Sequence, residues 1–341
     1  MIEAFIIIVI KCIIVAVALV STVPMSLWAE RRISAFIQDR LGPNRVGPLG
    51  LFQPVADVIK FIFKEDIVPE RANKFIYNLA PLIAFIPPLI TFAVIPYGTT
   101  DWGLGGNLAI ADIGIGILFI LAVSSINAYG LAYGGWASFS KYSLLGGLRS
   151  AAQIISFEIA MGLVVISLLM SAGSVNLNDM VLYQKENGWF IFTQPLAFIL
   201  FMITAFAETN RLPFDMPEAE SELVGGYHTE YSGLKFAMFF MGEYIAMATM
   251  SAIIVTLFLG GWSFPWIETL FPSGSSSVIV IAIVSITVFM GKVTAMLFFF
   301  IWVRWTLPRI RWDQLMKQGW KILIPLALLN IVLTAVFKFI W

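Results

Sequence analysis

The chain has 341 residues, of which 59% are apolar and 12% are charged, whereas soluble domains are about 45–50% apolar and about 25% charged. A soluble fold cannot hide so much apolar surface in one core, so lipid has to solvate the excess. The formal net charge is zero, which gives no reason to expect a nucleic-acid partner.

One cysteine, Cys12, and one histidine, His228, limit the chemistry that the chain can carry. An iron–sulfur cluster needs about four cysteines, or two with two histidines, and a structural zinc ion needs four such ligands. Neither of the glycine-rich nucleotide motifs, GxGxxG or GxxxxGK[ST], occurs. We therefore expect this chain to bind no metal ion, cofactor or redox centre of its own.

Apolar stretches predict an all-α integral membrane protein, a bundle of about eight transmembrane helices in a single membrane domain over residues 1–341. A helix needs about 20 apolar residues to cross about 30 Å of hydrocarbon. The second stretch contains Pro81, Pro87 and Pro88 and is predicted to be kinked, and Pro195 interrupts the fifth. The predicted spans are about 2–28, 75–96, 113–133, 151–172, 189–207, 236–260, 278–303 and 320–340.

Basic residues predict the orientation, because short loops that carry them stay on the cytoplasmic side. Of the 21 basic residues, 17 fall in the loops on one side, and the loops opposite hold only Lys185. We therefore expect both ends of the chain to face the periplasm, in a bacterial inner membrane rather than a mitochondrial one. The 17 residues are Arg31, Arg32, Arg40, Arg45, Lys60, Lys64, Arg71, Lys74, Lys141, Arg149, Arg211, Lys235, Arg304, Arg309, Arg311, Lys317 and Lys321.

The first long inside loop, residues 29–74, contains the stretch GLFQPVADVIKFIFKED. Polar residues recur there every three to four positions, at Gln53, Asp57, Lys60 and Lys64, with apolar residues between them. This pattern predicts an amphipathic helix that lies on the membrane surface or under a partner protein. A surface-lying helix with no further role explains the pattern equally well.

The second long inside loop, residues 208–235, is acidic although the rest of its face is basic. A solvated acidic loop is one explanation. Because these acids lie on the side where the other loops are basic, the sequence favours a second explanation, in which a cavity covered by protein holds them. The acidic residues are Glu208, Asp215, Glu218, Glu220, Glu222 and Glu230.

Three carboxylates are predicted to share the inner half of the membrane. Glu158 and Glu243 follow basic loop residues by nine and eight positions, which places each about 12–14 Å from the inside face at about 1.5 Å per residue. Glu208 closes the fifth helix on that face. A charged residue at mid-helix costs about 3 kcal/mol, so the pattern favours a proton or ion path. The alternative is that they pair with Lys292 or with the backbone to hold the bundle together.

Three motifs carry a resemblance to a known family. They are ERR at 30–32, RLGPNRVGPLGLFQPVADVIKFIFKED at 40–66 and AETNRLPFDMPEAESELVGGYHTEY at 207–231. The chain resembles the H-subunit family of proton-translocating NADH:quinone oxidoreductase, respiratory complex I, whose mitochondrial counterpart is subunit 1 of NADH dehydrogenase. The likeness runs over the whole chain, through WDQLMKQGWK at 312–321. Related membrane-bound hydrogenases contain looser versions of the two long motifs.

The resemblance implies a role that composition does not show. Members of this family form the heel of the membrane arm, enclose much of the tunnel for a lipid quinone, and carry no catalytic residue or metal. NADH, FMN and iron–sulfur clusters then belong to partner subunits of the peripheral arm, and small membrane subunits, lipid and quinone are further partners. The residues matching tunnel and junction positions are Glu30, Arg31, Asp57, Phe240 and Arg304. Those matching the acidic proton path are Glu158, Glu208, Asp215, Glu218, Glu220, Glu222, Glu230, Tyr231 and Glu243.

Other functions remain open from the residues alone. The chain could be the corresponding subunit of a membrane-bound hydrogenase, a stand-alone cation/proton transporter, or a structural anchor. We find no internal repeat of the kind that many transporters show, and an anchor leaves the intramembrane glutamates without a purpose. Gentle detergent extraction discriminates these functions, because iron–sulfur and flavin subunits should co-purify only with a subunit of the NADH-linked enzyme.

The charge pattern yields a prediction about topology. A reporter enzyme fused after Trp341 is expected to be active only in the periplasm, because 17 of the 21 basic residues lie on the other side. Cytoplasmic activity of this fusion would contradict the even number of membrane crossings.

Overall fold

The computed structural model describes residues 2–101, 107–218, 220–265 and 278–340, with side chains from residue 6 onward except at residues 220 and 221. Within these residues the chain is helical, and the only pairing of extended backbone is an isolated bridge between Thr99 and Asn107. The prediction of an all-α protein is confirmed. The elements are α1 (Ile2–Ile37), η1 (Pro48–Gly50), α2 (Gln53–Phe63), α3 (Lys74–Phe92), α4 (Gly116–Ser124), α5 (Ile126–Ala137), α6 (Lys141–Ala172), α7 (Leu177–Asn187), α8 (Phe190–Thr193), α9 (Pro195–Glu208), α10 (Glu220–Leu223), η2 (Gly226–His228), α11 (Gly233–Phe258), α13 (Val278–Thr306), α14 (Trp312–Gln318), the π-helical η3 (Gly319–Leu323) and α15 (Ile324–Ile340).

Seven helices in the described part of the chain are long and apolar enough to cross a membrane. The predicted fifth crossing is broken, because the short helix α8 ends at Thr193 and α9 begins at Pro195. With 14 residues, α9 spans only about 21 Å at about 1.5 Å per residue. The count of eight crossings therefore stays a prediction.

Several helices extend beyond the apolar stretches that predicted them. The first continues to Ile37, past the expected end at residue 28, and α6 begins at Lys141 rather than near residue 151. Hydropathy detects only the part of a helix that lipid surrounds, whereas backbone hydrogen bonding continues into polar sequence. These extensions bring Glu30 and Arg31 onto a helix rather than a loop.

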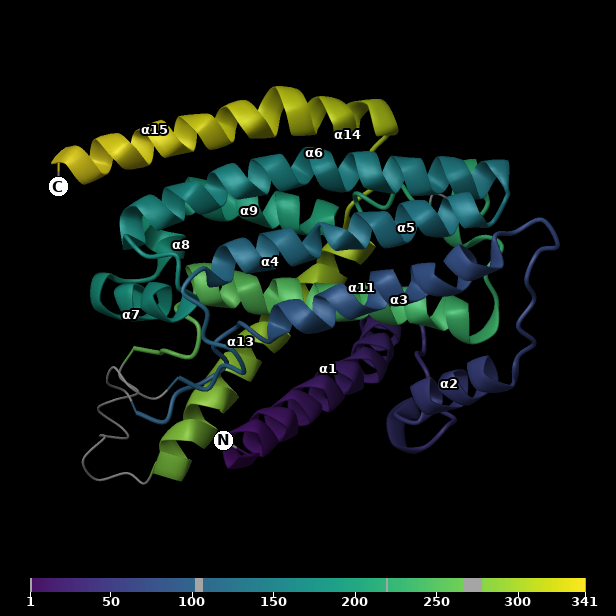
Figure 1. Cartoon of the computed structure of the whole chain (residues 1–341), viewed down its shortest axis with the longest axis horizontal. Helices are drawn as coiled ribbons and strands as arrows, with labels where there is room; N and C mark the ends of the chain where they lie inside the picture. The colour runs from purple at the N-terminus through teal and green to yellow at the C-terminus, as the bar shows by residue number, and fades with distance from the viewer. Residues whose placement is uncertain (1, 102–106, 219, 266–277, 341) are drawn as a thin grey trace.

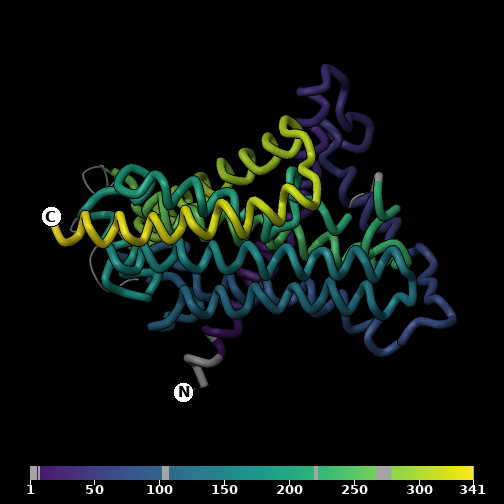
Figure 2. Tube along the Cα trace, turned by 90° about the horizontal axis from the view of Figure 1, so that it is seen from above, coloured from purple at the N-terminus to yellow at the C-terminus, as the bar shows by residue number. Residues whose placement is uncertain are grey.

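The long helix α11 lies at the centre of the bundle (Figure 1). Of the 18 most apolar consecutive residues of α11, 72% are buried, compared with 22% for α13 and 11% for α1. It packs against α3, α1 and α13, while α6 packs against α5, α9 and α15. Figure 2 shows α15 alongside α6, and in Figure 1 α1 and α13 cross the other helices obliquely. Both chain ends lie toward one end of the bundle and α2 lies toward the other.

Two threonine hydroxyls meet at one carbonyl near the end of α3. The hydroxyl of Thr91 donates to the carbonyl of Pro88 at 2.9 Å, and the hydroxyl of Thr249 on α11 donates to the same carbonyl at 3.1 Å. The helix continues through Pro81, Pro87 and Pro88, and the predicted kink stays a prediction.

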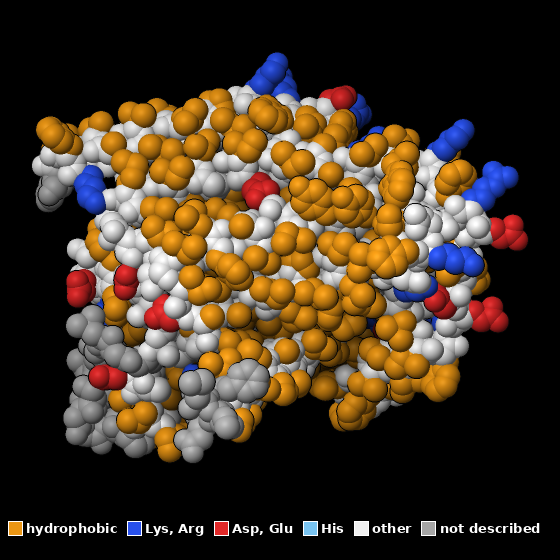
Figure 3. All heavy atoms as spheres, in the orientation of Figure 1, with side chains coloured by type: hydrophobic (Ala, Val, Ile, Leu, Met, Phe, Trp, Pro, Cys, Tyr) orange, Lys and Arg blue, Asp and Glu red, His pale blue; other side chains and the backbone are white. Residues whose placement is uncertain are grey.

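The amphipathic stretch of the first inside loop forms α2, as its spacing predicted. Four apolar side chains along it, those of Val55, Val58, Ile59 and Ile62, are about half exposed. Figure 3 shows apolar side chains over most of one face of the bundle, with charged side chains mainly around its edges. This distribution is the one expected of a surface that faces lipid or other apolar chains.

Glycines allow α3, α5 and α6 to approach closely, as small residues commonly do in membrane bundles. A Cβ atom at Gly130 of α5 would lie 2.7 Å from the backbone nitrogen of Ala84 in α3. One at Gly162 of α6 would meet nothing within 4 Å. Gly130 is therefore a position at which alanine tests the close contact, and Gly162 is its control.

We expect Gly130→Ala to destabilise the bundle by about 1–3 kcal/mol, the usual cost of overpacking. We expect Gly162→Ala to be neutral or to stabilise it by up to about 1 kcal/mol, because alanine is the better helix former. The thermal denaturation midpoint of the purified, assembled protein measures both effects. Equal midpoints for the two variants would contradict the close α3–α5 contact.

Candidate functional site

A buried arginine, Arg211, lies between two carboxylates just after α9. Its side chain is only 4% exposed, with Nη1 3.7 Å from Glu30 Oε2 and Nη2 3.8 Å from Glu243 Oε2. The guanidinium also lies over the ring of Tyr244, 4.2 Å from its centroid. Burial alone lowers the pKa of Arg211, but Tyr244 and the surrounding carboxylates raise it above its ordinary value. The arginine therefore stays charged.

Glu30 has two further partners. Arg304 of α13 places Nη1 2.6 Å from Glu30 Oε1, and the Tyr244 hydroxyl donates to Glu30 Oε2 at 2.7 Å. We call Arg211, Glu30, Glu243, Tyr244 and Arg304 the Arg211 centre. It joins α1, α11, α13 and the loop after α9, and its two carboxylates are matched by two guanidinium groups, as buried charges require.

Glu218 and His228 extend this centre into the acidic loop. His228 Nε2 lies 3.3 Å from Glu218 Oε1, and the Tyr227 hydroxyl donates to Glu243 Oε1 at 3.2 Å. Burial raises the pKa of Glu218. Interaction with His228, a hydrogen bond with Glu243 and, more weakly, the charge of Arg211 outweigh burial and lower this pKa to about 2. Glu218 therefore stays ionised at neutral pH.

The pKa of Asp215 is shifted in the opposite direction. Arg309 Nη2 donates to its Oδ2 at 2.7 Å. Burial first, and then the negative charge of Glu218, nevertheless raise the pKa of Asp215 to about 6. An acid with this pKa can gain and lose a proton near neutral pH, as proton transfer requires.

The other two expected relay carboxylates form a second group. Glu208, at the end of α9, is buried, and Glu158 on α6 is half-buried and close enough to interact with it electrostatically. No hydrogen bond or ion pair between described residues joins Glu208 to Glu243. The three expected relay residues thus lie in two groups, Glu158 with Glu208 and Glu243 with Arg211.

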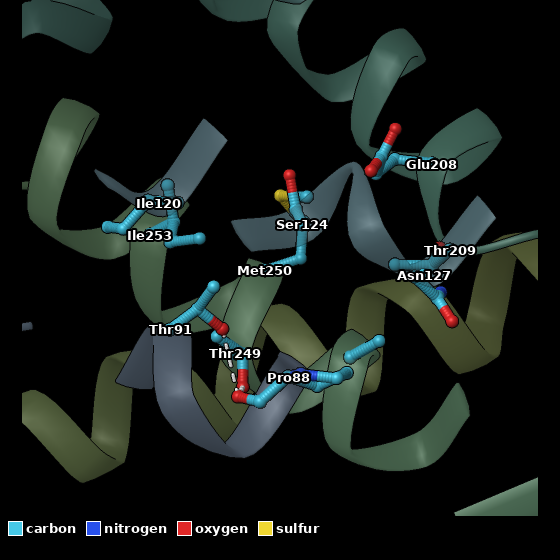
Figure 4. Close-up of a pocket in the computed structure, with 11 residues that line it drawn as sticks. Pro88, Thr91, Ile120, Ser124, Asn127, Glu208, Thr209, Thr249, Met250 and Ile253 are labelled. Atoms are coloured by element: carbon cyan, nitrogen blue, oxygen red, sulfur yellow. Dashed lines mark hydrogen bonds between the residues drawn. The ribbon is translucent and has the colours of Figure 1, made fainter. Parts of the chain in front are cut away.

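A water-sized cavity lies beside Glu208 (Figure 4). Glu208, Asn127 and Thr209 lie toward one side of it in this view, and Ile120 and Ile253 toward the other. Ser124 also interacts with Glu208. We call this space the Glu208 cavity. It is lined by Pro88, Thr91, Ile120, Ser124, Asn127, Glu208, Thr209, Ala246, Thr249, Met250 and Ile253.

Helix periodicity connects the two groups. Ala246 and Met250 of α11 line the Glu208 cavity and lie three and seven residues after Glu243. Residues at this spacing share one face of a helix. Glu243 therefore lies one helical turn from the cavity, on the face of α11 that lines it.

Two of the acidic-loop residues lie away from the buried groups. Glu222 is 45% exposed and pairs with Arg149 Nη1 at 2.6 Å, so an ion pair at the protein surface holds it. Glu220 begins α10, but its side chain lies outside the described residues.

Glu230 and Tyr231 lie against α3. The Tyr77 hydroxyl donates to the backbone carbonyl of Glu230 at 2.8 Å, and the Tyr77 and Tyr231 rings stack with centroids 4.1 Å apart. The Tyr231 hydroxyl donates to the carbonyl of Gly134 at 3.4 Å. These contacts attach the end of the acidic loop to α3 and α5.

The remaining tunnel candidates divide between two places. Arg31 Nη1 lies 2.8 Å from Asp57 Oδ2, which ties α2 to α1. Phe240 belongs to a row of aromatic rings, with its centroid 5.1 Å from that of Phe236 and 6.4 Å from that of Tyr244. Among the described residues, no group of three or more His, Cys, Asp or Glu side chains is arranged to hold a metal ion.

Several residues of the site were not singled out by sequence patterns, namely Arg211, Tyr227, His228, Tyr244 and Arg309. The charge pattern placed Arg211 only among the basic loop residues. A signal existed, because it is a single arginine directly after a buried helix and inside an acidic stretch.

Gln153 of α6 is a further residue that the sequence did not indicate. Its Nε2 lies within hydrogen-bond distance of the carbonyls of Ala207 and Phe214, at 2.8 Å each, and of Asn210 Oδ1 at 3.1 Å. It holds both ends of the turn that carries Arg211. An uncharged glutamine in a membrane helix has no distinctive sequence pattern, so only the fold reveals this contact.

Comparison with known proteins gives consistent results. A family model described as NADH dehydrogenase matches residues 10–335. The chain is 50% identical over 325 residues to "NADH-quinone oxidoreductase subunit 8" of Rhodothermus marinus, covering 93% of each chain. It is 53% identical over 310 residues to an NADH-quinone oxidoreductase H-type subunit of Geobacter metallireducens, covering 90% of this chain and 89% of the relative. The H-type subunit of the NADH-quinone oxidoreductase of Salinibacter ruber is 49% identical over 325 residues, covering 93% of this chain and 92% of the relative.

The geometry of the Arg211 centre predicts a large effect on stability. Arg211→Met should destabilise the protein by about 3–5 kcal/mol, because it leaves buried carboxylates without their partner. Arg149→Met breaks the exposed pair with Glu222 and should cost only about 0–1 kcal/mol. Thermal unfolding of the purified assembly compares the two variants, and a loss no larger for Arg211→Met than for Arg149→Met would disprove the compensating role.

Proposed function

Since the chain belongs to the NADH dehydrogenase family of complex I membrane subunits, we propose that it encloses the quinone-access tunnel and couples quinone reduction to proton translocation through buried carboxylates. NADH, FMN and the iron–sulfur clusters are then held by peripheral partner subunits. The chain spans the bacterial inner membrane with both ends in the periplasm.

The observation that carries this proposal is the position of Arg211. One of its nitrogens faces Glu30, a residue of the expected tunnel, and another faces Glu243, a residue of the expected proton path. Two unit charges 4 Å apart interact by about 4 kcal/mol at an effective dielectric constant of about 20. Such an interaction alters a proton affinity by about a thousandfold, so a movement of Arg211 toward one carboxylate changes the proton affinity of the other.

The tunnel wall is formed by the aromatic row and the charged groups beside it. Quinone sites combine apolar and aromatic surface with a few polar groups that orient the ligand. Phe236, Phe240 and Tyr244 provide the aromatic surface, and Glu30 and Arg304 lie at its end. The pair between Arg31 and Asp57 holds α2 as the floor beneath it.

Protons enter the path from the acidic loop. Reduction of a quinone to a quinol takes up two electrons and two protons, so the charge near the tunnel changes in turnover. Asp215, with its pKa of about 6, exchanges protons near neutral pH, and Glu218 stays ionised beside it. Arg211 responds to that charge and changes the free energy of protonating Glu243.

The path continues through the Glu208 cavity. Hydroxyl and amide groups of Thr91, Ser124, Asn127 and Thr249 lie among its mostly apolar side chains, and a space of this size holds a water molecule where two to four polar partners face it. Water there connects Glu243, one helical turn away, with Glu208. Glu158, beside Glu208, is half-exposed on α6 between the exposed side chains of Ile155 and Ile159. Glu158 transfers protons to a neighbouring membrane subunit.

We expect Glu243→Gln and Glu158→Gln to leave the complex assembled but to slow proton pumping and quinone reduction together by about tenfold or more, because positioned proton-transfer groups contribute about 10²–10⁴-fold. Glutamine keeps the size and polarity of glutamate but cannot exchange a proton. The double variant should lose less than the sum of the two single losses in activation free energy, because residues of one relay act as a unit.

The measurement is proton uptake in vesicles, normalised to NADH oxidation by a soluble artificial acceptor that needs no tunnel. Glu186→Gln, an exposed acid of α7 outside the site, is the control and should behave as wild type. An assembled double variant with wild-type pumping and quinone reduction would refute the relay.

A further inference from the structure

Lys292 is a buried cation that the proposed relay does not use. It occupies the middle of α13, which is a membrane-spanning helix by length and composition. A lysine at such a position is costly unless other groups compensate its charge. Among the described residues no carboxylate lies within ion-pair distance of it, so Lys292 does not pair with the intramembrane glutamates as one sequence-based alternative held.

Its partners are instead three backbone carbonyls just beyond the end of α11. Lys292 Nζ donates to the carbonyl oxygens of Leu259 at 2.6 Å, Gly261 at 3.0 Å and Ser263 at 2.5 Å. The ammonium also lies 4.6 Å from the centroid of the Trp189 ring. An ammonium group has three donors, and all three are used.

Two glycines allow the three carbonyls to point toward one ammonium group. Gly260 and Gly261 follow the end of α11 at Phe258, with φ angles of +70° and +53°. A Cβ at Gly260 would lie 2.7 Å from Trp189 Nε1, and one at Gly261 would lie 2.8 Å from a methyl group of Val181. The left-handed turn therefore requires glycine, both for its conformation and for space.

A second side chain, that of Gln184 of α7, also binds the end of α11. Its Nε2 donates to the carbonyl of Thr256 at 2.9 Å, and its Oε1 accepts from the amide of Gly260 at 3.0 Å. The last carbonyls of a helix lack partners within the helix and carry about half a negative charge. Gln184 supplies hydrogen bonds at this end of α11, and Lys292 supplies hydrogen bonds and a positive charge.

We propose that Lys292 is a positioning residue, whose ammonium caps the end of α11 and holds the helix so that Glu243 and Tyr244 meet Arg211 and Glu30. The helix has 26 residues and no proline, so it moves as a rigid body. Release of its capped end shifts or rotates the whole helix, including the residues that line the Glu208 cavity. The effect on turnover rests on the proposed function, whereas the cap itself does not.

Lys338 offers a matched control. It too is a lysine on a membrane helix, and it donates to a single backbone carbonyl, that of Met170. It lies in the last turn of α15, where a lysine can extend to the membrane interface. Met170 belongs to the last turn of α6, so Lys338→Met removes a lysine from a membrane helix without disturbing the end of α11.

The first experiment measures amide hydrogen exchange at residues 259–263 in the intact complex. Lys292→Met, which keeps most of the side-chain volume, should increase exchange there by at least about tenfold, the equivalent of about 1.4 kcal/mol. Lys292→Arg, which keeps charge and donors, should increase it less, and Lys338→Met should leave it unchanged. Unchanged exchange in Lys292→Met would overturn the cap.

The second experiment measures turnover in the same assembled complexes. Lys292→Met should slow quinone reduction by on the order of 10- to 100-fold relative to reduction of the artificial acceptor, because a displacement of about 1 Å at a reacting site has effects of that size. It should also shift the pH profile of quinone reduction, since Glu243 loses its position beside Arg211. Increased exchange with normal quinone turnover and an unchanged pH profile would overturn the positioning role.

A chemical rescue separates charge from packing. Lys292→Ala removes the fragment that propylammonium replaces, so added propylammonium should restore protection of residues 259–263 and part of the quinone turnover. The neutral 1-propanol, of similar size, should not. Equal rescue by both compounds would overturn the electrostatic cap, and this holds even if Lys292→Met itself fails to assemble.

Failure of the proposed function has a different signature. If Glu243→Gln keeps wild-type pumping while Lys292→Met increases exchange at residues 259–263, the cap stands and the relay is wrong. If Glu243→Gln stops pumping while exchange at residues 259–263 does not change in Lys292→Met, the relay stands and the cap is wrong.

Discussion

A single guanidinium group, that of Arg211, compensates carboxylates that come from helices far apart in the sequence. Glu30 reaches it from α1 and Glu243 from α11, and Arg304 of α13 shares Glu30 with it. In a protein interior, charge left without a partner costs several kcal/mol. Three membrane helices, α1, α11 and α13, and the loop after α9 therefore have to meet at one place.

The long helix α11 connects the parts of the protein that the proposed mechanism needs. Its first half bears Phe240, Glu243 and Tyr244, and its second half lines the Glu208 cavity through Thr249 and Met250. It is continuous, and 72% of its most apolar stretch is buried. In the proposed mechanism this helix connects the tunnel with the proton path by geometry as well as by charge.

The acidic loop divides its residues by environment rather than by sequence. Asp215 and Glu218 lie three residues apart. Burial and like charge raise the pKa of Asp215, whereas interactions with His228 and Glu243 lower the pKa of Glu218. Glu222, a few residues further on, pairs with Arg149 at the surface. Six acids that look equivalent in the sequence thus include one with a raised pKa, one with a lowered pKa and one in a surface ion pair.

The sequence alone determined that the chain is helical and embedded in lipid, because apolar composition and the length of each stretch depend only on local chemistry. It also indicated Glu158, Glu208 and Glu243, since a carboxylate inside an apolar stretch is costly wherever the helix packs. Tertiary structure alone decided the partners. Arg211 lies 181 positions after Glu30 and 32 before Glu243, and Lys292 binds carbonyls that any residue possesses. Pairings between distant segments, and contacts with backbone, have no local pattern, so only the packing of the helices reveals them.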